Sequence, residues 1–320
     1  MLSVNENAYS LVGELCEAAD KYAVSVEVDP SGTTLIDAGI NVRGGLAAGR
    51  MVTEICMGGL GGAQISQKSY SSYDLLSILV HTDHPAIATL GSQFAGWQIK
   101  RGDFFAIGSG PARALALKPH EIYDTINYQD KSERAILVLE TAKRPPLEII
   151  EGFASECKVQ PDQLYIVLVP TTSLAGSTQV SGRIVETGLH KLSKIGINPL
   201  TVHYACGQAP IAPVHPKFAT AMGMTNDVIL YGGVAYYALE HDDDDTLRAI
   251  LKHAPSSASK QYGKPFREIF KEANHDFYQV DPNLFAPAKF ILNNLTTGST
   301  FQVGEINPEI LSKSLKLSEL

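Results

Sequence analysis

The amino-acid sequence predicts a mixed fold of the α/β or α+β class, arranged in two lobes. Short, unbroken apolar runs that are typical of buried strands alternate with segments of helical periodicity along the whole chain. A length of 320 residues leads us to expect two domains. Because no low-complexity linker interrupts the chain, we place the boundary at the proline pair that ends residues 143–146. This divides the chain into α/β lobes of residues 1–145 and 146–320, which are free to exchange segments.

The first lobe is predicted to begin with a helix and two strands. Residues 5–23 have helical spacing, residues 24–29 alternate as a strand, and residues 31–40 form a second strand after a Pro-Ser-Gly turn. Residues 45–59 predict a helix that paired glycines end. The short apolar run of residues 75–82 predicts a buried strand.

Glycines and prolines separate the elements in the middle of the chain. Residues 84–99 predict a helix, or a helix followed by an extended segment. Residues 102–117 predict a strand, a glycine-rich turn and a short helix. The apolar runs of residues 134–141 and 163–170 predict two more strands, and residues 145–157 between them have helical spacing.

The rest of the second lobe is predicted to continue this alternation. Residues 177–195 predict a helix and residues 199–205 a strand, whereas residues 215–239 favour a helix, a turn and a strand. The acidic run of residues 242–245 indicates the solvated start of a helix. Residues 289–304 have the pattern of a hairpin.

Composition and charge exclude several classes of protein. Hydrophobic residues make up 44% of the chain and charged residues 19%, which is ordinary for a soluble globular protein. The formal net charge of −8 argues against nucleic acid as a partner. We expect neither a signal peptide nor a membrane span, because the N-terminus has no basic region and no run of about 18 apolar residues occurs. The cysteines lie far apart, which indicates reduced thiols in the cytoplasm; they are Cys16, Cys56, Cys157 and Cys206.

The helix predicted at residues 177–195 presents Arg183 and Glu186 three positions apart on its polar half. Such a pair is usually a solvated ion pair worth about a few tenths of a kcal/mol, and the residues alone favour that interpretation. The small, polar loop that leads into Ser177 and Gln179 favours a ligand site instead, because strand-to-helix loops often bind ligands.

Three further segments are candidate binding sites. In "IGSGPARAL", two glycines allow close approach of the backbone and an arginine adds charge, which suits an anion or a planar ring. A tight structural turn is the alternative. "LGSQFAGWQ" and "MGMTNDVILYGG" place polar residues at predicted element ends, the second just before an expected strand, and helix capping is the alternative there. The candidate residues are Ser92, Gln93, Trp97, Gly108, Ser109, Gly110, Pro111, Arg113, Thr225, Asn226 and Asp227.

The stretch "HTDHP" raises the question of a metal site. Its His81, Asp83 and His84 lack the spacing of a zincin helix or of a zinc-dependent deaminase. No metal ligand is therefore predicted. The chain also lacks the G-x-S-x-G motif of a hydrolase nucleophile.

Four stretches of the sequence together resemble the methenyltetrahydromethanopterin cyclohydrolase family. "MLSVNENA", "GSGPARAL", "STQVSGRIVET" and "MGMTNDVILYGG" follow the order of that family, and the resemblance runs from residue 1 to about residue 310. It implies a homotrimer of two-domain subunits, a pterin in the cleft between the domains, and no metal or organic cofactor. "EICMGGLGG" and "LGSQFAGW" resemble the bacterial, methylotroph-like branch, and Phe94 stands where archaeal relatives often carry lysine.

The resemblance also implies a reaction in one-carbon metabolism and the residues that perform it. The family reversibly hydrolyses methenyl-tetrahydromethanopterin to the formyl form. The residues that match its catalytic pair are Glu186, expected to act as general base, and Arg183, expected to orient it. Two alternatives stay open: a pterin-binding protein without turnover, and a metal-dependent amidohydrolase that uses His81, Asp83 and His84.

Overall fold

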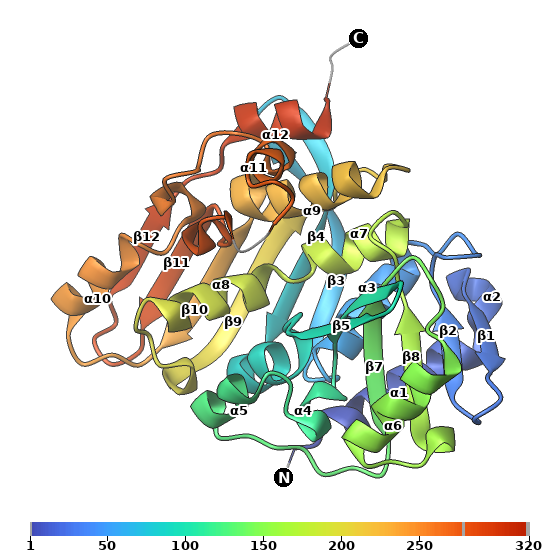
Figure 1. Ribbon diagram of the computed structural model, residues 1–320. Coiled ribbons are helices and arrows are strands. Elements are labelled where there is room, and N and C mark those ends of the chain that lie inside the picture. Colours follow the sequence, from blue (N-terminus) through green and yellow to red (C-terminus); the bar gives the residue numbers. More distant parts are fainter. Residues whose placement is uncertain (1, 277–278, 318–320) are drawn as a thin grey trace. The chain divides into compact units, whose positions relative to one another are not determined.

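The computed structural model describes residues 2–276 and 279–317 of the chain (Figure 1). It confirms the predicted mixed α/β class, because the described residues form two six-stranded mixed sheets together with helices. No helix in these two ranges is both long and apolar enough to span a bilayer.

The chain divides into two compact units, and neither is continuous in sequence. Unit 1 comprises residues 1–63 and 86–179, and unit 2 comprises residues 64–85 and 180–320. The boundary expected at residue 145 lies inside unit 1. The short segment of residues 64–85 belongs to the unit that is otherwise built from the second half of the chain.

Unit 1 contains one six-stranded sheet. In spatial order its strands are β1 (Ser25–Val28), β2 (Thr34–Asp37), β8 (Leu164–Leu168), β7 (Ala135–Glu140), β6 (Phe104–Ser109) and β5 (Trp97–Arg101). β2, β8 and β7 run parallel, and the other neighbours are antiparallel. The strands predicted in this half of the chain are thereby confirmed, including the extended segment after the helix of residues 84–99.

Helices cover both faces of this sheet. They are α1 (Val4–Glu17) and α3 (Leu46–Cys56) on one face and α6 (Leu147–Cys157) on the other. Alternate side chains of β7 point to opposite faces, so Val138 joins the core under α1 and α3, and Leu139 joins the core under α6. A strand buried on both faces needs apolar residues throughout, which is why an unbroken apolar run predicted β7.

The other helices of unit 1 are short. They are α2 (Ala19–Tyr22), the π-helix η1 (Ala86–Gln93), α4 (Arg113–Ala116), α5 (His120–Ile126), the 3-10 turn η2 (Pro161–Gln163) and α7 (Leu174–Ser181), whose last two residues fall in unit 2. Glycines end α3 as predicted: Gly58 and Gly59 have φ angles of +67° and +65°, which glycine adopts without steric cost.

Unit 2 contains the second sheet. In spatial order its strands are β12 (Thr300–Gly304), β11 (Lys289–Asn294), β10 (Val234–Leu239), β9 (Val202–Pro210), β4 (Tyr73–Thr82) and β3 (Gly61–Tyr70). β10 and β11 are parallel, whereas β12 pairs with β11, β9 with β10 and β4 with β9 in antiparallel fashion. The predicted hairpin of residues 289–304 is β11 and β12. The edge strand β3 was not predicted.

Two long helices pack on this sheet: α8 (Ile184–Lys194) contacts β4, β9 and β10, and α9 (Phe218–Gly232) contacts β9 (Figure 1). The remaining helical elements are η3 (Pro199–Thr201), α10 (Asp244–Leu251), η4 (Ser256–Ala258), α11 (Phe266–Glu272), η6 (Pro282–Leu284) and α12 (Pro308–Leu315). The acidic run does begin a helix, because the Asp243 carboxylate accepts a hydrogen bond from the amide of Asp245 at the start of α10.

Two predictions about helices are wrong in detail. Residues 177–195 form two helices, α7 and α8, interrupted at residues 182–183. The amide of Arg183 donates to the carbonyl of Val180 at 3.0 Å, so the chain closes a tighter turn there than an α-helix makes. Residues 225–227 lie inside α9, not before a strand.

Candidate active site

Arg183 and Glu186 lie at the start of α8. Arg183 occupies the position just before the helix, and Glu186 is its third residue. Each residue is only 6% exposed, which contradicts a solvated ion pair on a polar face. Burying charged groups costs free energy, and such residues concentrate at functional sites. The positive end of the helix dipole also favours the ionised form of a carboxylate in the first turn.

Glycines on the sheet let the first turn of α8 come close to it. A Cβ atom at Gly207 of β9 would lie 3.0 Å from the side chains of Ile184 and Val185. A Cβ atom at Gly233, just before β10, would lie 2.5 Å from Cδ1 of Ile184. The turn that carries Glu186 is therefore closely packed on the sheet of its own unit.

The two predicted binding segments of unit 1 lie side by side. The amide of Gly110 donates to the carbonyl of Ser92 at 2.9 Å. Nη1 of Arg113 donates to the carbonyls of Leu90 and Ser92 at 3.1 and 3.0 Å, and this arginine is fully buried. Arg113 thus ties the end of η1 to the turn that follows β6.

Aromatic rings flank the guanidinium of Arg113. Its central carbon lies 5.3 Å from the ring centroid of Phe94 and 5.6 Å from that of Tyr123, within the range of cation–π attraction. A lysine at position 94 would instead place a second cation beside Arg113. The charge of Arg113 is therefore used inside the fold, and its predicted role in attracting an anion stays a prediction.

The glycines of the "IGSGPARAL" turn are explained by packing. A Cβ atom at Gly108 would lie 3.1 Å from Cβ of Trp97 on the neighbouring strand. Gly110 has a φ of +89°, and a Cβ atom there would lie 3.3 Å from Cγ2 of Val138. The space that glycine leaves is filled by neighbouring strands, as in the tight structural turn that the sequence left open.

Replacing Gly110 by alanine is expected to destabilise unit 1 by about 1–2 kcal/mol, since an L-residue is strained at positive φ. The thermal midpoint should fall by a few degrees, with little change in substrate affinity. Gly13→Ala is the matched control, because a Cβ atom there meets nothing within 4 Å and the residue lies inside α1. Weaker substrate affinity at an unchanged midpoint would instead assign this turn to binding.

Four more predicted residues of unit 1 are buried. Trp97 meets the ring of Phe153 edge-on, with centroids 5.4 Å apart. Oγ of Ser92 donates to the carbonyl of Cys56 at 2.6 Å, and Oγ of Ser109 lies 3.7 Å from the same residue's sulfur. These contacts fasten η1, β5 and β6 to the core. The fourth, Gln93, ends η1.

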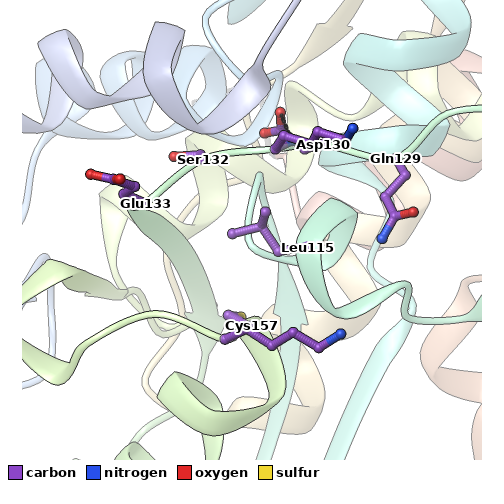
Figure 2. Close-up of a pocket in the computed structure, with 8 residues that line it drawn as sticks. Leu115, Gln129, Asp130, Ser132, Glu133 and Cys157 are labelled. Carbon is purple, nitrogen blue, oxygen red and sulfur yellow. Dashed lines mark hydrogen bonds between the residues drawn. The ribbon is translucent and has the colours of Figure 1, made fainter.

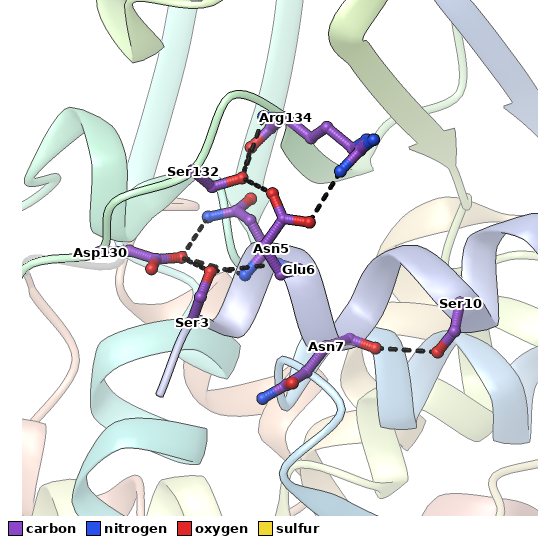
Figure 3. Close-up of polar contacts among 8 residues, drawn as sticks. All are labelled: Ser3, Asn5, Glu6, Asn7, Ser10, Asp130, Ser132 and Arg134. Carbon is purple, nitrogen blue, oxygen red and sulfur yellow. Dashed lines mark hydrogen bonds and ion pairs between the residues drawn. The ribbon is translucent and has the colours of Figure 1, made fainter. Parts of the chain in front are cut away.

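Sequence reasoning missed Asn5, a fully buried residue that holds the turn in place. Its Nδ2 donates to the carbonyl of Pro111 at 3.0 Å and to Oδ2 of Asp130 at 2.8 Å, and its Oδ1 accepts from the amide of Ile136 at 2.9 Å. Figure 3 shows Asp130 beside the first turn of α1, where the side chain of Asn5 reaches its carboxylate. An asparagine among the apolar positions at the start of a helix, in "MLSVNENA", was the signal that could have revealed it.

Ser177 and Gln179 lie on α7, and each is 1% exposed. The preceding loop caps this helix, because Oγ of Ser173 accepts from the amide of Gly176 at 3.0 Å. The predicted passage from a small polar loop into a helix is therefore confirmed.

The polar residues of "MGMTNDVILYGG" stabilise α9 and its neighbours. The side chains of Thr225 and Asn226 donate to one carbonyl a turn earlier, at 3.0 and 2.9 Å. Asp227 is fully buried, accepts from the amide of Phe266 at 2.8 Å and from the hydroxyl of Ser314, and so joins α11 and α12 to α9. Burial raises the pKa of the Asp227 carboxyl to about 7.

Two other features lie apart from these residues. Unit 1 has an open pocket of about 440 Å³ (Figure 2), lined by Leu115, Gln129, Asp130, Lys131, Ser132, Glu133, Cys157 and Lys158. None of the predicted site residues, all of which the structure describes, lines it. His81, Asp83 and His84 are exposed at the end of β4. Within residues 2–276 and 279–317, no group of three His, Cys, Asp or Glu side chains is placed to share a metal ion.

Comparison with known proteins gives a consistent result. A family model described as Cyclohydrolase (MCH) matches residues 3–315. The methenyltetrahydromethanopterin cyclohydrolase of Methanothermobacter marburgensis is 47% identical over 320 residues, which cover 99% of this chain and 100% of that protein. The proteins of the same name from Methanocaldococcus jannaschii and Methanococcoides burtonii are 45% and 42% identical, over 100% of both chains. These relatives are archaeal, and the likeness to a bacterial branch stays a prediction.

Proposed function

Because this chain belongs to the methenyltetrahydromethanopterin cyclohydrolase family, we propose that it hydrolyses a methenyl-pterin with Glu186 as general base and Arg183 as the group that orients it. The reaction converts methenyl-tetrahydromethanopterin reversibly to the formyl form. Family membership supports the reaction, and the position and burial of the two side chains support their roles.

The chemistry requires a base more than an electrophile. The methenyl bridge is an amidinium-like cation, so its carbon is already electrophilic and lacks only a placed, activated water. The Glu186 carboxylate takes a proton from that water as its oxygen bonds to the bridge carbon. One carbon–nitrogen bond then breaks as the added hydroxyl becomes the formyl carbonyl and releases its proton to solvent, and the proton held by Glu186 passes to the leaving nitrogen. The product is the formyl amide, the carboxylate is regenerated, and hydrolysis of the cation releases one proton overall.

Arg183 suits the role of orienting this carboxylate. Residues three apart at the start of a helix share one face, and a guanidinium beside a carboxylate favours its ionised form, which is the form a general base needs. A buried carboxylate also attracts the cationic bridge of the substrate.

The single observation that carries the proposal is the burial of both charged side chains in the first turn of α8. Nothing in helix stability requires it, because an exposed pair of the same spacing gives the small gain available to a surface ion pair. A site that excludes water from its charged groups strengthens their action on a bound substrate.

We propose Ser177 and Gln179, buried on the helix that follows a small polar loop, as contacts of the pterin. The other predicted residues are engaged within the fold, and we propose that they support the site. They are Ser92, Gln93, Trp97, Gly108, Ser109, Gly110, Pro111, Arg113, Thr225, Asn226 and Asp227.

The test of the reaction is the loss of methenyl-pterin absorbance in the presence of purified protein. Loss of absorbance with formation of the formyl product supports the proposal. Binding of the methenyl-pterin without conversion would mean a pterin-binding protein without turnover.

Removal of metal ions is expected to leave turnover unchanged. We propose that neither a metal nor an organic cofactor takes part, because the substrate cation supplies the electrophile. The measurement is the absorbance assay after exhaustive treatment with EDTA, alongside untreated protein. Activity that falls with EDTA and returns with zinc would favour the metal-dependent amidohydrolase.

We also propose a cytoplasmic homotrimer, on the family resemblance alone. Light scattering coupled to size-exclusion chromatography is expected to give about three times the 34.5 kDa of the chain. A mass of one chain at micromolar concentration would contradict this assembly.

A further inference from the structure

We propose that Tyr237 and Gly188 are positioning residues that set where α8 holds Glu186. Tyr237 lies on β10 and is fully buried, and Gly188 lies on α8 two residues after Glu186. The inference rests on the proposed role of Glu186 as the base. It states that a contact between α8 and the sheet fixes the position of the Glu186 carboxylate.

The first step is that α8 is not a continuation of α7, so α7 does not determine its direction. The chain turns at residues 182–183, and α8 begins a new hydrogen-bonding ladder in which the amide of Thr187 donates to the carbonyl of Arg183 at 2.8 Å. The position of its first turn must therefore be set by contacts between α8 and the sheet that it covers.

The second step is a specific polar contact in that interface. The hydroxyl of Tyr237 donates to the main-chain carbonyl of Val185 at 2.7 Å. Val185 directly precedes Glu186 in α8. The tyrosine therefore holds the backbone turn from which Glu186 projects.

The third step is the fit of Gly188 to this hydroxyl. A Cβ atom at Gly188 would lie 2.1 Å from Oη of Tyr237 and 3.0 Å from its Cζ. Any other residue would push the ring or the helix away. Glycine inside a helix costs about 1 kcal/mol relative to alanine, so its presence here is explained by the closeness of the tyrosine.

The hydrogen bond runs from the tyrosine to the helix, because a main-chain carbonyl can only accept. Burial, and after it the negative charge of Glu186, raise the pKa of Tyr237 well above its ordinary value. Tyr237 therefore stays protonated and donates to the Val185 carbonyl.

Tyr237→Phe tests this role, and Tyr231→Phe is its matched control. Tyr231 is also fully buried in unit 2, and its hydroxyl donates to a main-chain carbonyl, that of Lys264, at 2.6 Å, but this bond does not involve α8. Both variants lose one buried hydroxyl bond and should lose similar thermal stability. Only Tyr237→Phe is expected to lower kcat, by roughly 10-fold with KM nearly unchanged, because a base displaced by a fraction of an ångström works less well.

The comparison separates this inference from the proposed function. Each tyrosine variant is also measured in a Glu186→Gln background, where Tyr237→Phe should lower kcat by less than 2-fold because the positioned group is gone. Equal kcat for Tyr237→Phe and Tyr231→Phe in the otherwise natural chain would overturn the positioning role. Normal kcat for Glu186→Gln alone would overturn the proposed function itself.

Gly188→Ala provides a second readout on the same contact. The new methyl group meets Oη of Tyr237, so kcat should fall. Combining Gly188→Ala with Tyr237→Phe removes the oxygen that the methyl meets and should recover part of the lost kcat. Additive losses in the double variant would show that the two residues do not act through one contact.

Discussion

Replacing Glu186 by glutamine is expected to lower kcat by about 10²–10⁴-fold, the loss typical of removing a general base. Glutamine keeps the shape of the side chain but cannot accept the proton of the attacking water. KM should change less, and its rise would measure how far the carboxylate attracts the substrate cation. The measurement is steady-state hydrolysis of the methenyl-pterin, with circular dichroism to confirm that the variant is folded.

Glu268→Gln is the matched control for this variant. Glu268 is likewise the third residue of a helix in unit 2, but it is exposed and pairs with Lys313 at 3.4 Å. Its loss should leave kcat unchanged and alter stability by no more than a surface ion pair contributes. A folded Glu186→Gln protein with near-normal turnover would contradict the general-base role and leave the chain without an identified base.

Replacing Arg183 by glutamine is expected to lower kcat by roughly 10- to 100-fold, which corresponds to about 1.5–3 kcal/mol for a hydrogen bond to a charged group. In the proposed mechanism the guanidinium orients the carboxylate, so the loss should fall on kcat more than on KM. Arg183→Lys keeps the positive charge but lacks the planar guanidinium with its paired N–H donors, so it should retain activity only in part.

The double variant distinguishes a catalytic unit from two separate residues. If Arg183 acts through Glu186, then removing both should cost less free energy than the sum of the two single losses. Arg267→Gln, at an exposed position in the first turn of α11, is the control for loss of an arginine. Fully additive losses in the double variant would mean that Arg183 acts on the substrate independently of Glu186.

Much of the fold could be predicted from the sequence, because buried strands and helices have recognisable patterns of apolar residues. β7 is apolar throughout since it is buried on both faces, and paired glycines ended α3 as expected. The edge strand β3 was missed because "GGAQISQKSY" is polar and half-exposed along most of its length, so that it shows neither alternation nor an apolar run. Its extended shape comes from pairing, which a local pattern does not record.

Predictions failed for residues whose secondary structure depends on contacts with distant parts of the chain. "DVILYGG" has the β-branched, apolar character of a buried strand, yet it forms the end of a buried helix, since a short apolar run fits both. Asp227 therefore looked like a residue at the end of an element, whereas it lies in mid-helix and joins α11 and α12 to α9. Arg113 was proposed to add charge for an anion; the structure encloses it by carbonyls and rings, and its role toward an anion stays a prediction.

The pair proposed as catalytic shows most clearly what a local sequence pattern leaves out. Spacing alone favoured a surface ion pair for Arg183 and Glu186, and only the resemblance to a family assigned them chemistry. Their burial depends on what packs around α8, which no property of residues 177–195 encodes. Asn5 was missed for the same reason, because its partners at Pro111, Asp130 and Ile136 are more than 100 residues away in the sequence.

The place of residues 64–85 in unit 2 has a consequence for synthesis on the ribosome. β4 emerges early, but His81 pairs with Cys206 of β9, which is made 125 residues later. At about 5–20 residues per second this delay is roughly 6–25 s, during which the edge of β4 that later pairs with β9 has no partner, although β3 already covers the other edge. A nascent chain that stalls in this interval would expose a strand edge able to pair with other chains. Conversely, a fragment of residues 180–320 would present β9 as an open edge, so it should aggregate unless a peptide that contains β3 and β4 is supplied.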